Sequence, residues 1–378
     1  MSTSFNPVDQ EWMELALEQA RKSLYLSNPN PRVGCVIVKN GKVLGMGNTQ
    51  EIGGPHAEVQ ALADARSRID GADDLFGATF YISLEPCSHI GKTPPCVDAV
   101  IAAKPKAVFI AMVDPNPKVS GKGIAALEAA GIEVQIGLLE DSAGSLNRGF
   151  ISRMTRGLPY VRLKIAASLD GFTALPNGQS QWITGQAARD DGHHWRAQAC
   201  AIISGGGTVK QDDPQLNVRA VQTQRQPVKM IIDSHLEIPL TAKVLQDSNA
   251  IVVCAKPEAK LLKEMRAQLG QRGIRLLEMP NPKGKVDLPA LFRYLALELE
   301  MNEIHIEAGS KLNGSLIREG CVDELLVYLA PTLLGGGLPL ANLSPLSSLI
   351  GPDRRDWQIV DHTLIGADVR LRLRKLNQ

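Results

Sequence analysis

Residues 54–58 of this chain read Gly-Pro-His-Ala-Glu, and residues 84–96 read Leu-Glu-Pro-Cys-Ser-His-Ile-Gly-Lys-Thr-Pro-Pro-Cys. The two segments supply one imidazole, His56, and two thiols, Cys87 and Cys96. An imidazole and two thiolates give Zn²⁺ three protein ligands and leave a fourth position for water, whose pKa the ion lowers toward neutrality. The spacing therefore predicts a zinc site with one open position.

Glu58 follows His56 by two residues and is expected to carry the proton of the reacting water. A His-x-Glu unit before two later cysteines matches the signature of zinc deaminases. A structural zinc site is the alternative, because such sites are closed by a fourth ligand and His89 lies between the cysteines. Free cysteines without zinc are a further alternative. If Cys87 and Cys96 each open a helix, the helix N-termini would favour their thiolates.

Outward from this motif, helical and strand-like periods alternate. Helices are predicted at 8–24, 56–68, 96–103 and 124–130. Strands are predicted at 33–39, 42–47, 78–84, 106–113 and 132–136, the first two joined by the hairpin pair Asn40-Gly41. Residues 1–147 are therefore expected to be one three-layer α/β domain.

A linker is expected at 148–158, where arginines and Gly157-Leu158-Pro159 interrupt the pattern, and a second α/β domain at 159–378. Its helices are predicted at 186–198, 258–270, 287–298 and 310–319. Its strands are predicted at 160–167, 200–204, 228–233, 249–254, 274–278, 303–307, 323–330 and 367–373.

Charge and composition argue against other classes of protein. The 41 basic and 40 acidic residues leave a net charge of +1, and aromatic residues make up 4% of the chain, which disfavours nucleic-acid binding. No apolar run approaches the ~20 residues of a membrane helix, and the N-terminus has no secretory pattern. The six dispersed cysteines favour reduced thiols or a metal over disulfides, so we expect a cytoplasmic protein.

Further segments are shared with one family, namely Asn28–Gly34, Asp114–Pro117, Gln181–Thr184, Asp212–Pro214 and Glu307–Gly309. With the long spacing between the cysteines, they resemble the bifunctional riboflavin-biosynthesis deaminase/reductase family over nearly the whole chain. The resemblance implies a cytidine-deaminase-like α/β/α domain followed by a dihydrofolate-reductase-like α/β domain. It also implies zinc-dependent hydrolytic deamination of 2,5-diamino-6-(5-phosphoribosylamino)pyrimidin-4-one, and then reduction of the ribosyl group to ribityl by NADPH.

The resemblance also implies site residues. In the deaminase pocket it suggests Asn30, Lys92 and Asp114, although a turn residue and two loop charges are equally good readings. For NADPH it implies Ala166, Trp182, Thr208, Asp212 and Ser234, with the cofactor phosphates over Gly309, Ser310, Lys311, Leu312, Asn313, Gly314 and Ser315. For the substrate it implies Ser180, Arg196, Leu216, Arg219 and Glu307, and the two guanidinium groups suit its phosphate.

Several features keep alternatives open. Lys164 could polarise the reducible carbon or bind a ribose hydroxyl, Trp182 could belong to the core, and Arg196 to a solvated helix face. We interpret His193-His194 as a solvated face, because adjacent helix residues point in different directions. The glycine run 335–337 is interpreted as a plain loop.

Two other functions compete with the leading one. These are a nucleic-acid base deaminase with an accessory domain, and a regulatory protein with an inactive zinc site. For the leading function we expect a homo-oligomer, most simply a dimer.

Overall fold

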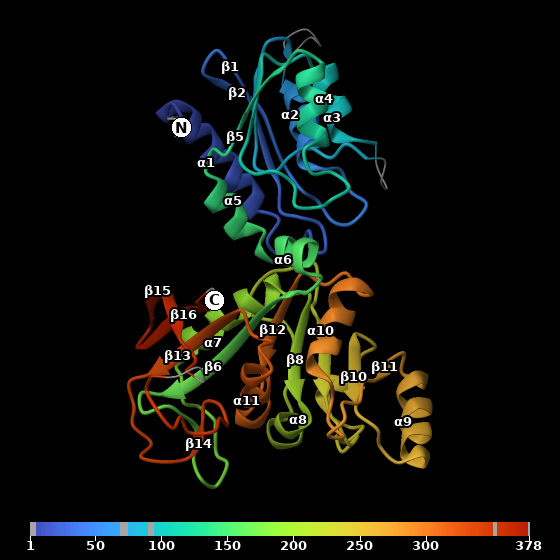
Figure 1. Ribbon diagram of the computed structural model, residues 1–378, viewed down its shortest axis with the longest axis vertical. Helices are drawn as coiled ribbons and strands as arrows, with labels where there is room; N and C mark the ends of the chain where they lie inside the picture. The colour runs from blue at the N-terminus through green and yellow to red at the C-terminus, as the bar shows by residue number, and fades with distance from the viewer. Residues whose placement is uncertain (1–4, 69–74, 90–93, 351–353, 377–378) are drawn as a thin grey trace. The chain divides into compact units, whose positions relative to one another are not determined.

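The computed structural model describes residues 5–68, 75–89, 94–350 and 354–376, and the chain divides into two compact units, 1–157 and 158–378 (Figure 1). Each unit is an α/β structure with its own core. No helix in the described ranges combines the length and hydropathy that crossing a membrane requires.

The described residues of the first unit form six α-helices and five strands. Its helices are α1 (Pro7–Arg21), α2 (Ala57–Arg68), α3 (Cys96–Ala102), α4 (Lys122–Ala129), α5 (Glu140–Leu146) and α6 (Arg148–Arg156). Its strands are β1 (Gly34–Lys39), β2 (Lys42–Asn48), β3 (Thr79–Ile82), β4 (Ala107–Ile110) and β5 (Glu133–Ile136). The sheet order is β2-β1-β3-β4-β5, with β1 antiparallel to both neighbours and the last three strands parallel.

Helices cover both faces of this sheet, α1 and α5 on one side and α2, α3 and α4 on the other (Figure 1). Two glycines of β2 bring α2 unusually close. A Cβ atom on Gly45 would lie 2.3 Å from the Ala61 carbonyl oxygen, and one on Gly47 would lie 2.2 Å from that of Ala57. Only glycine fits at such distances, so these two positions set how deeply α2 sits on the sheet.

The segment expected to be a linker is mostly helical. Residues 148–156 form α6, which belongs to the first unit, and Phe150 is 6% exposed within the core of that unit. Phe150, Ile151 and Met154 recur at helical spacing and all contact this core. Of the arginines that suggested an interruption, Arg153 lies between these apolar positions, and Arg148 and Arg156 flank them.

The second unit has five α-helices, α7 (Gln186–Gln198), α8 (Gly206–Asp212), α9 (Ala259–Gln271), α10 (Leu288–Leu297) and α11 (Ser310–Arg318), within the described residues. Its strands are β6 (Tyr160–Ser168), β7 (Phe172–Ala174), β8 (Ala201–Gly205), β9 (Val228–Ile232), β10 (Ala250–Cys254), β11 (Arg275–Glu278), β12 (Glu303–Glu307), β13 (Glu324–Ala330), β14 (Leu338–Pro339), β15 (Trp357–Ile365) and β16 (Asp368–Lys375).

The main sheet of this unit has nine strands in the order β11-β10-β9-β8-β12-β6-β13-β16-β15. The first seven are parallel, and β16 and β15 are antiparallel additions. Strands β7, β14 and β15 were not predicted. The sequence of β15 does not alternate regularly between apolar and polar residues, and most of its side chains are exposed. The strand therefore lacks the pattern by which a half-buried strand is predicted.

Helix α7 is fixed to the sheet by charged and aromatic contacts. The Trp195 ring lies beneath three guanidinium groups, at 4.4 Å from Arg162, 5.0 Å from Arg372 and 5.5 Å from Arg370. Glu324 accepts hydrogen bonds from Arg162 at 2.7 Å and from Arg372 at 3.0 Å. Arg370 pairs instead with Asp191 of α7, at 3.0 Å. The three arginines are thus neutralised within the fold, and they hold one side of α7 in place.

Candidate functional site

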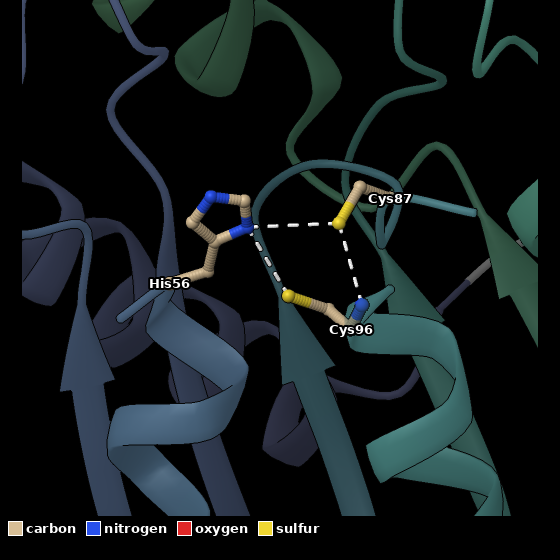
Figure 2. Close-up of side chains that lie close together, drawn as sticks. All are labelled: His56, Cys87 and Cys96. Carbon is tan, nitrogen blue, oxygen red and sulfur yellow. Dashed lines mark hydrogen bonds between the residues drawn. The ribbon is translucent and has the colours of Figure 1, made fainter. Parts of the chain in front are cut away.

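His56, Cys87 and Cys96 converge at one end of the first unit's sheet (Figure 2). His56 immediately precedes α2, Cys87 lies in the loop after β3, and Cys96 is the first residue of α3. His56 Nδ1 lies 3.2 Å from Cys96 Sγ and 3.6 Å from Cys87 Sγ. Only Cys96 opens a helix. Cys87 instead accepts the Cys96 backbone N–H at 3.3 Å.

The donor set fits zinc. Its ligand atoms, one imidazole nitrogen and two sulfurs, lie within 4.8 Å of one another, which is the nitrogen-and-thiolate set that Zn²⁺ prefers. His89, which could have closed the site, is exposed and is absent from this cluster of described residues. The set therefore has three protein ligands and keeps the open position of a catalytic site.

Glu58 lies in the first turn of α2 and is 3% exposed. Its carboxyl interacts with the Cys96 thiol, so it adjoins the metal ligands. Burial raises the pKa of the Glu58 carboxyl to about 7. The close seating of α2 on β2 holds this carboxyl beside the cluster.

The loop that carries Cys87 is anchored by Glu85, a residue to which the sequence reasoning gave no role. Its buried carboxylate accepts backbone N–H groups from Asp114 (3.1 Å), Gly121 (2.9 Å), Gly123 (2.8 Å) and Ile124 (3.3 Å). Glu85 thus satisfies the N-terminus of α4 and ties it to the zinc loop. A Cβ atom on Gly123 would lie 2.2 Å from the Pro86 carbonyl oxygen, which shows how closely these segments pack.

The weaker pocket candidates of the first unit differ in their surroundings. Asp114 is buried, burial raises the pKa of its carboxyl to about 6, and its Oδ1 accepts the Asn116 N–H at 2.8 Å. Asn30 is half-buried in a turn, where its N–H donates to the Ser27 carbonyl at 2.7 Å. Lys92 lies outside the described residues.

The second unit contains a pocket of about 650 Å³ above the carboxyl ends of β6, β8 and β12. Thirteen residues expected at the reductase site line it, namely Lys164, Ala166, Ser180, Trp182, Arg196, Thr208, Asp212, Leu216, Arg219, Glu307, Gly309, Ser310 and Asn313. Ligands of parallel α/β sheets bind at this edge of the strands.

Five of the expected cofactor residues do not line this pocket: Ser234, Lys311, Leu312, Gly314 and Ser315. Four of these five residues lie on α11, and helical geometry explains why they do not line the pocket. Only Ser310 at the start of the helix and Asn313, about one turn later, face the pocket. Leu312 packs toward Gly205, and Gly314 lies against the Asn342 carbonyl.

The expected substrate residues Arg196 and Glu307 form a pair. Arg196 Nε donates to Glu307 Oε1 at 2.5 Å, and Nη2 donates to Oε2 at 2.8 Å. Arg196 Nη1 donates further to the Asn217 carbonyl at 3.0 Å. The guanidinium beside it holds the pKa of Glu307 well below its usual range despite burial. Most donors of Arg196 are therefore already engaged.

Lys164, Arg189 and Arg219 are the pocket cations with no acidic hydrogen-bond partner in the described chain. Arg189 donates to the Thr184 carbonyl and to Gln186 Oε1, both at 2.6 Å. Lys164 pairs in register with Glu307 on the adjacent strand, and burial lowers the pKa of its ammonium. Arg219 is exposed, and its Nη1 donates only to Asn217 Oδ1, at 3.3 Å.

One alternative from the sequence is excluded, that of Trp182 in the core, and one interpretation is wrong, that of His193 on a solvated face. Trp182 is not a core residue: it is 69% exposed at the pocket, and the Arg189 guanidinium lies 4.4 Å from its ring. His193 is not on a solvated face: it is 5% exposed and lines the pocket, whereas His194 is exposed. Arg189, His193 and Lys243 line the pocket without having been assigned to it. The sequence could have indicated His193 as a pocket residue, because it precedes Arg196 by three positions and so shares its side of the helix.

Comparisons with known proteins cover both units. The family described as "Cytidine and deoxycytidylate deaminase zinc-binding region" matches residues 7–112, and the "RibD C-terminal domain" matches residues 159–371. The Riboflavin biosynthesis protein RibD of Escherichia coli (strain K12) is 41% identical over 378 residues, which cover 97% of this chain and 99% of that protein. That of Aquifex aeolicus is 42% identical and covers 89% of this chain and 90% of its own.

Solved structures agree. Acinetobacter baumannii RibD, form 1, has a TM-score of 0.86 at 41% identity, over 98% of this chain and 99% of that one. A Thermotoga maritima protein described as a diaminohydroxyphosphoribosylaminopyrimidine deaminase/5-amino-6-(5-phosphoribosylamino)uracil reductase has a TM-score of 0.82 at 32% identity, with the same two coverages.

Proposed function

The chain belongs to the RibD family of bifunctional riboflavin-biosynthesis deaminase/reductases, and on that premise we propose which of its residues carry each reaction. It joins a cytidine-deaminase-like domain with a zinc site to a dihydrofolate-reductase-like domain that uses NADPH. It is thus a pyrimidine deaminase and ribosyl reductase. A nucleic-acid deaminase with an unrelated accessory domain is excluded, because both halves match this one family.

In the first reaction, the amino group at ring position 2 of the phosphoribosylated diaminopyrimidinone leaves as ammonia and a carbonyl takes its place. His56, Cys87 and Cys96 would hold the zinc ion, which would act as a Lewis acid and make water nucleophilic at neutral pH. Glu58 accepts a proton from the attacking water and delivers it to the departing nitrogen. The observation that supports this role is the burial of Glu58 beside the ligands, which keeps the proton from exchanging with bulk water.

Glu58→Gln tests the assignment, because the amide keeps the shape of the side chain and cannot carry the proton. Ammonia release should fall about 10²–10⁴-fold. Zinc content should match the wild type, and reduction of supplied deaminated product should be unchanged. Glu51→Gln, an exposed carboxylate of the same unit, is the matched control. Parallel loss of zinc, or deamination near the wild-type rate, would contradict the proposal.

In the second unit, the pocket residues divide between cofactor and substrate. We assign Gly309, Ser310 and Asn313 to the cofactor phosphates, since they line the pocket at the first turn of α11 and a helix N-terminus holds anions. NADPH supplies the reducing equivalent when it is bound. Trp182 offers an exposed ring at the same pocket. Arg196 and Glu307, fixed by their mutual hydrogen bonds, orient the substrate rather than neutralise its phosphate.

Arg219 is then the main partner of the substrate phosphate, because it is exposed and donates to Asn217 Oδ1 rather than to a carboxylate. Arg189 also lacks an acidic partner, but its guanidinium is engaged by the Thr184 carbonyl, Gln186 Oε1 and the Trp182 ring. Arg219→Ala should raise the KM for the deaminated substrate about ten- to a hundredfold, as expected for a charge-assisted contact. The KM for NADPH and the rate of ammonia release should stay within twofold. Arg275→Ala, an exposed arginine of β11, is the control.

Arg196→Ala should behave differently from Arg219→Ala. It leaves Glu307 buried without its partner, so both kcat and stability should fall. An Arg219→Ala effect confined to NADPH would move that residue to the cofactor side and overturn the substrate assignment.

For the assembly, we propose a homodimer in the cytoplasm. Strand β15 is an edge strand with exposed apolar side chains, notably Leu364 at 74% and Ile359 at 55% exposure, which supports pairing with a second copy. All six cysteines are free, which is typical of a reducing compartment. Sedimentation at several protein concentrations tests the dimer, and a monomer throughout would refute it.

A further inference from the structure

His193 is a buried residue of the reductase pocket to which the proposed reaction gives no role. It lies on α7 three positions before Arg196, so both side chains leave the same side of the helix. Both line the pocket. A buried imidazole facing a ligand pocket requires a hydrogen-bonding explanation.

The explanation begins with Arg219. His193 Nδ1 accepts the backbone N–H of Arg219 at 3.3 Å. Since Nδ1 is the acceptor, the neutral ring carries its proton on Nε2. Residues 214–219 form neither helix nor strand, so their position depends on contacts of this kind. Gln226 makes two more hydrogen bonds to this segment. Its Oε1 accepts the Val218 N–H at 2.8 Å, and its Nε2 donates to the Val218 carbonyl at 2.9 Å.

The charges around His193 keep it an acceptor. Burial first, and then the nearby Arg196 and Arg219 guanidinium groups, lower the pKa of the His193 imidazole to about 4, whereas Glu307 and Asp190 oppose the shift. The ring is therefore neutral near pH 7. Protonation would place a third positive charge beside the two arginines and remove the acceptor for the Arg219 N–H.

We propose that His193 is a positioning residue of the reductase: its Nδ1 fixes the backbone of Arg219 and thereby holds that guanidinium where the phosphate of the ribosyl substrate binds. The inference rests on the proposed assignment of Arg219 to the substrate. His193 is not a metal ligand with His194, because His194 is exposed and no such pair occurs among the metal-binding clusters of the described residues.

The test uses the full-length, zinc-loaded enzyme and measures reduction with the deaminated substrate and NADPH varied in turn. His193→Phe keeps a ring of similar size and removes the hydrogen-bond acceptor. If the phenylalanine variant does not fold, His193→Leu is used in its place, because leucine also lacks an acceptor. His193→Asn keeps an acceptor, because the asparagine Oδ1 can take the place of Nδ1. His194→Asn, at the exposed neighbour, is the matched control. Each variant is also combined with Arg219→Ala.

His193→Phe should raise the KM for the substrate two- to tenfold, which corresponds to one net hydrogen bond. The KM for NADPH and kcat should stay within twofold, and His193→Asn should restore most of the loss. In the Arg219→Ala background, His193→Phe should add less than twofold, because its effect passes through Arg219. A side chain that only fills space would not give this pattern.

Three results would overturn the inference: an undiminished effect of His193→Phe in the Arg219→Ala background, a change confined to NADPH, or no rescue by asparagine. If Arg219→Ala by itself leaves the substrate KM unchanged, the assignment of Arg219 fails instead. The two failures are therefore distinguishable.

Discussion

Replacing Glu85 by glutamine should destabilise the first unit more than any exposed change of the same size. The carboxylate accepts four backbone N–H groups, two at each oxygen. The amide of glutamine keeps one oxygen, so two N–H groups lose their acceptor and face an NH₂ group instead. Hydrogen bonds to a charged group contribute about 1.5–3 kcal/mol each, so the loss should be about 3–6 kcal/mol.

Thermal unfolding measures this loss. For a unit of this size, 1 kcal/mol shifts Tm by about 2–4 °C, so Glu85→Gln should lower the Tm of the first unit by about 6–24 °C. That transition can be identified by the loss of ammonia release. Zinc affinity should fall as well, because Cys87 lies on the anchored loop.

Glu128→Gln changes an exposed carboxylate on α4 itself and should alter stability by less than about 0.5 kcal/mol. If Glu85→Gln costs less than about 1 kcal/mol, the single hydrogen-bond magnitude used above does not apply at this site. The reasoning that the carboxylate holds the zinc loop would then be refuted.

Gly47→Ala should cost about 1–3 kcal/mol or more and reduce deamination, since its methyl group would meet the Ala57 carbonyl and displace α2 with Glu58. Urea unfolding measures it against Gly144→Ala, whose methyl group would approach only Ile151 Cδ1 at 3.8 Å, and equal stability of the two variants would contradict the packing argument. A fragment ending at residue 157 should be more stable than one ending at 147 by at least about 3 kcal/mol, because the shorter one loses the buried Phe150. Denaturation of both fragments decides this, and matching midpoints would show that α6 adds nothing to the fold.

The sequence predicts best where chemistry lies in short segments. The zinc ligands His56, Cys87 and Cys96 are confirmed as one site, because residue types and spacing specified the chemistry without knowledge of the fold. The two fold classes and the two reactions are likewise confirmed. The role of Glu58 remains a prediction.

What the sequence did not reveal depends on partners that are distant along the chain. Glu85 reads as a loop charge until residues 114–124 are placed around it. Arg196 reads as a free cation for phosphate, yet it is joined to Glu307, which lies 111 residues later. The interpretation of His193-His194 failed because helical periodicity shows that two residues diverge but not which one faces the interior.

Helix α7 lines the ligand pocket with one side and contacts arginines of the sheet with the other, and this limits how its sequence can change during evolution. Ala188, Gly192, His193 and Arg196 line the ligand pocket. Trp195 and Asp191 face the arginines of β6 and β16 on the other side. Residues of β16 do not line the pocket, yet substitutions there should alter the reductase reaction through their contacts with α7. Sequence drift in this helix should concentrate at exposed positions such as Gln186, Ala187 and His194.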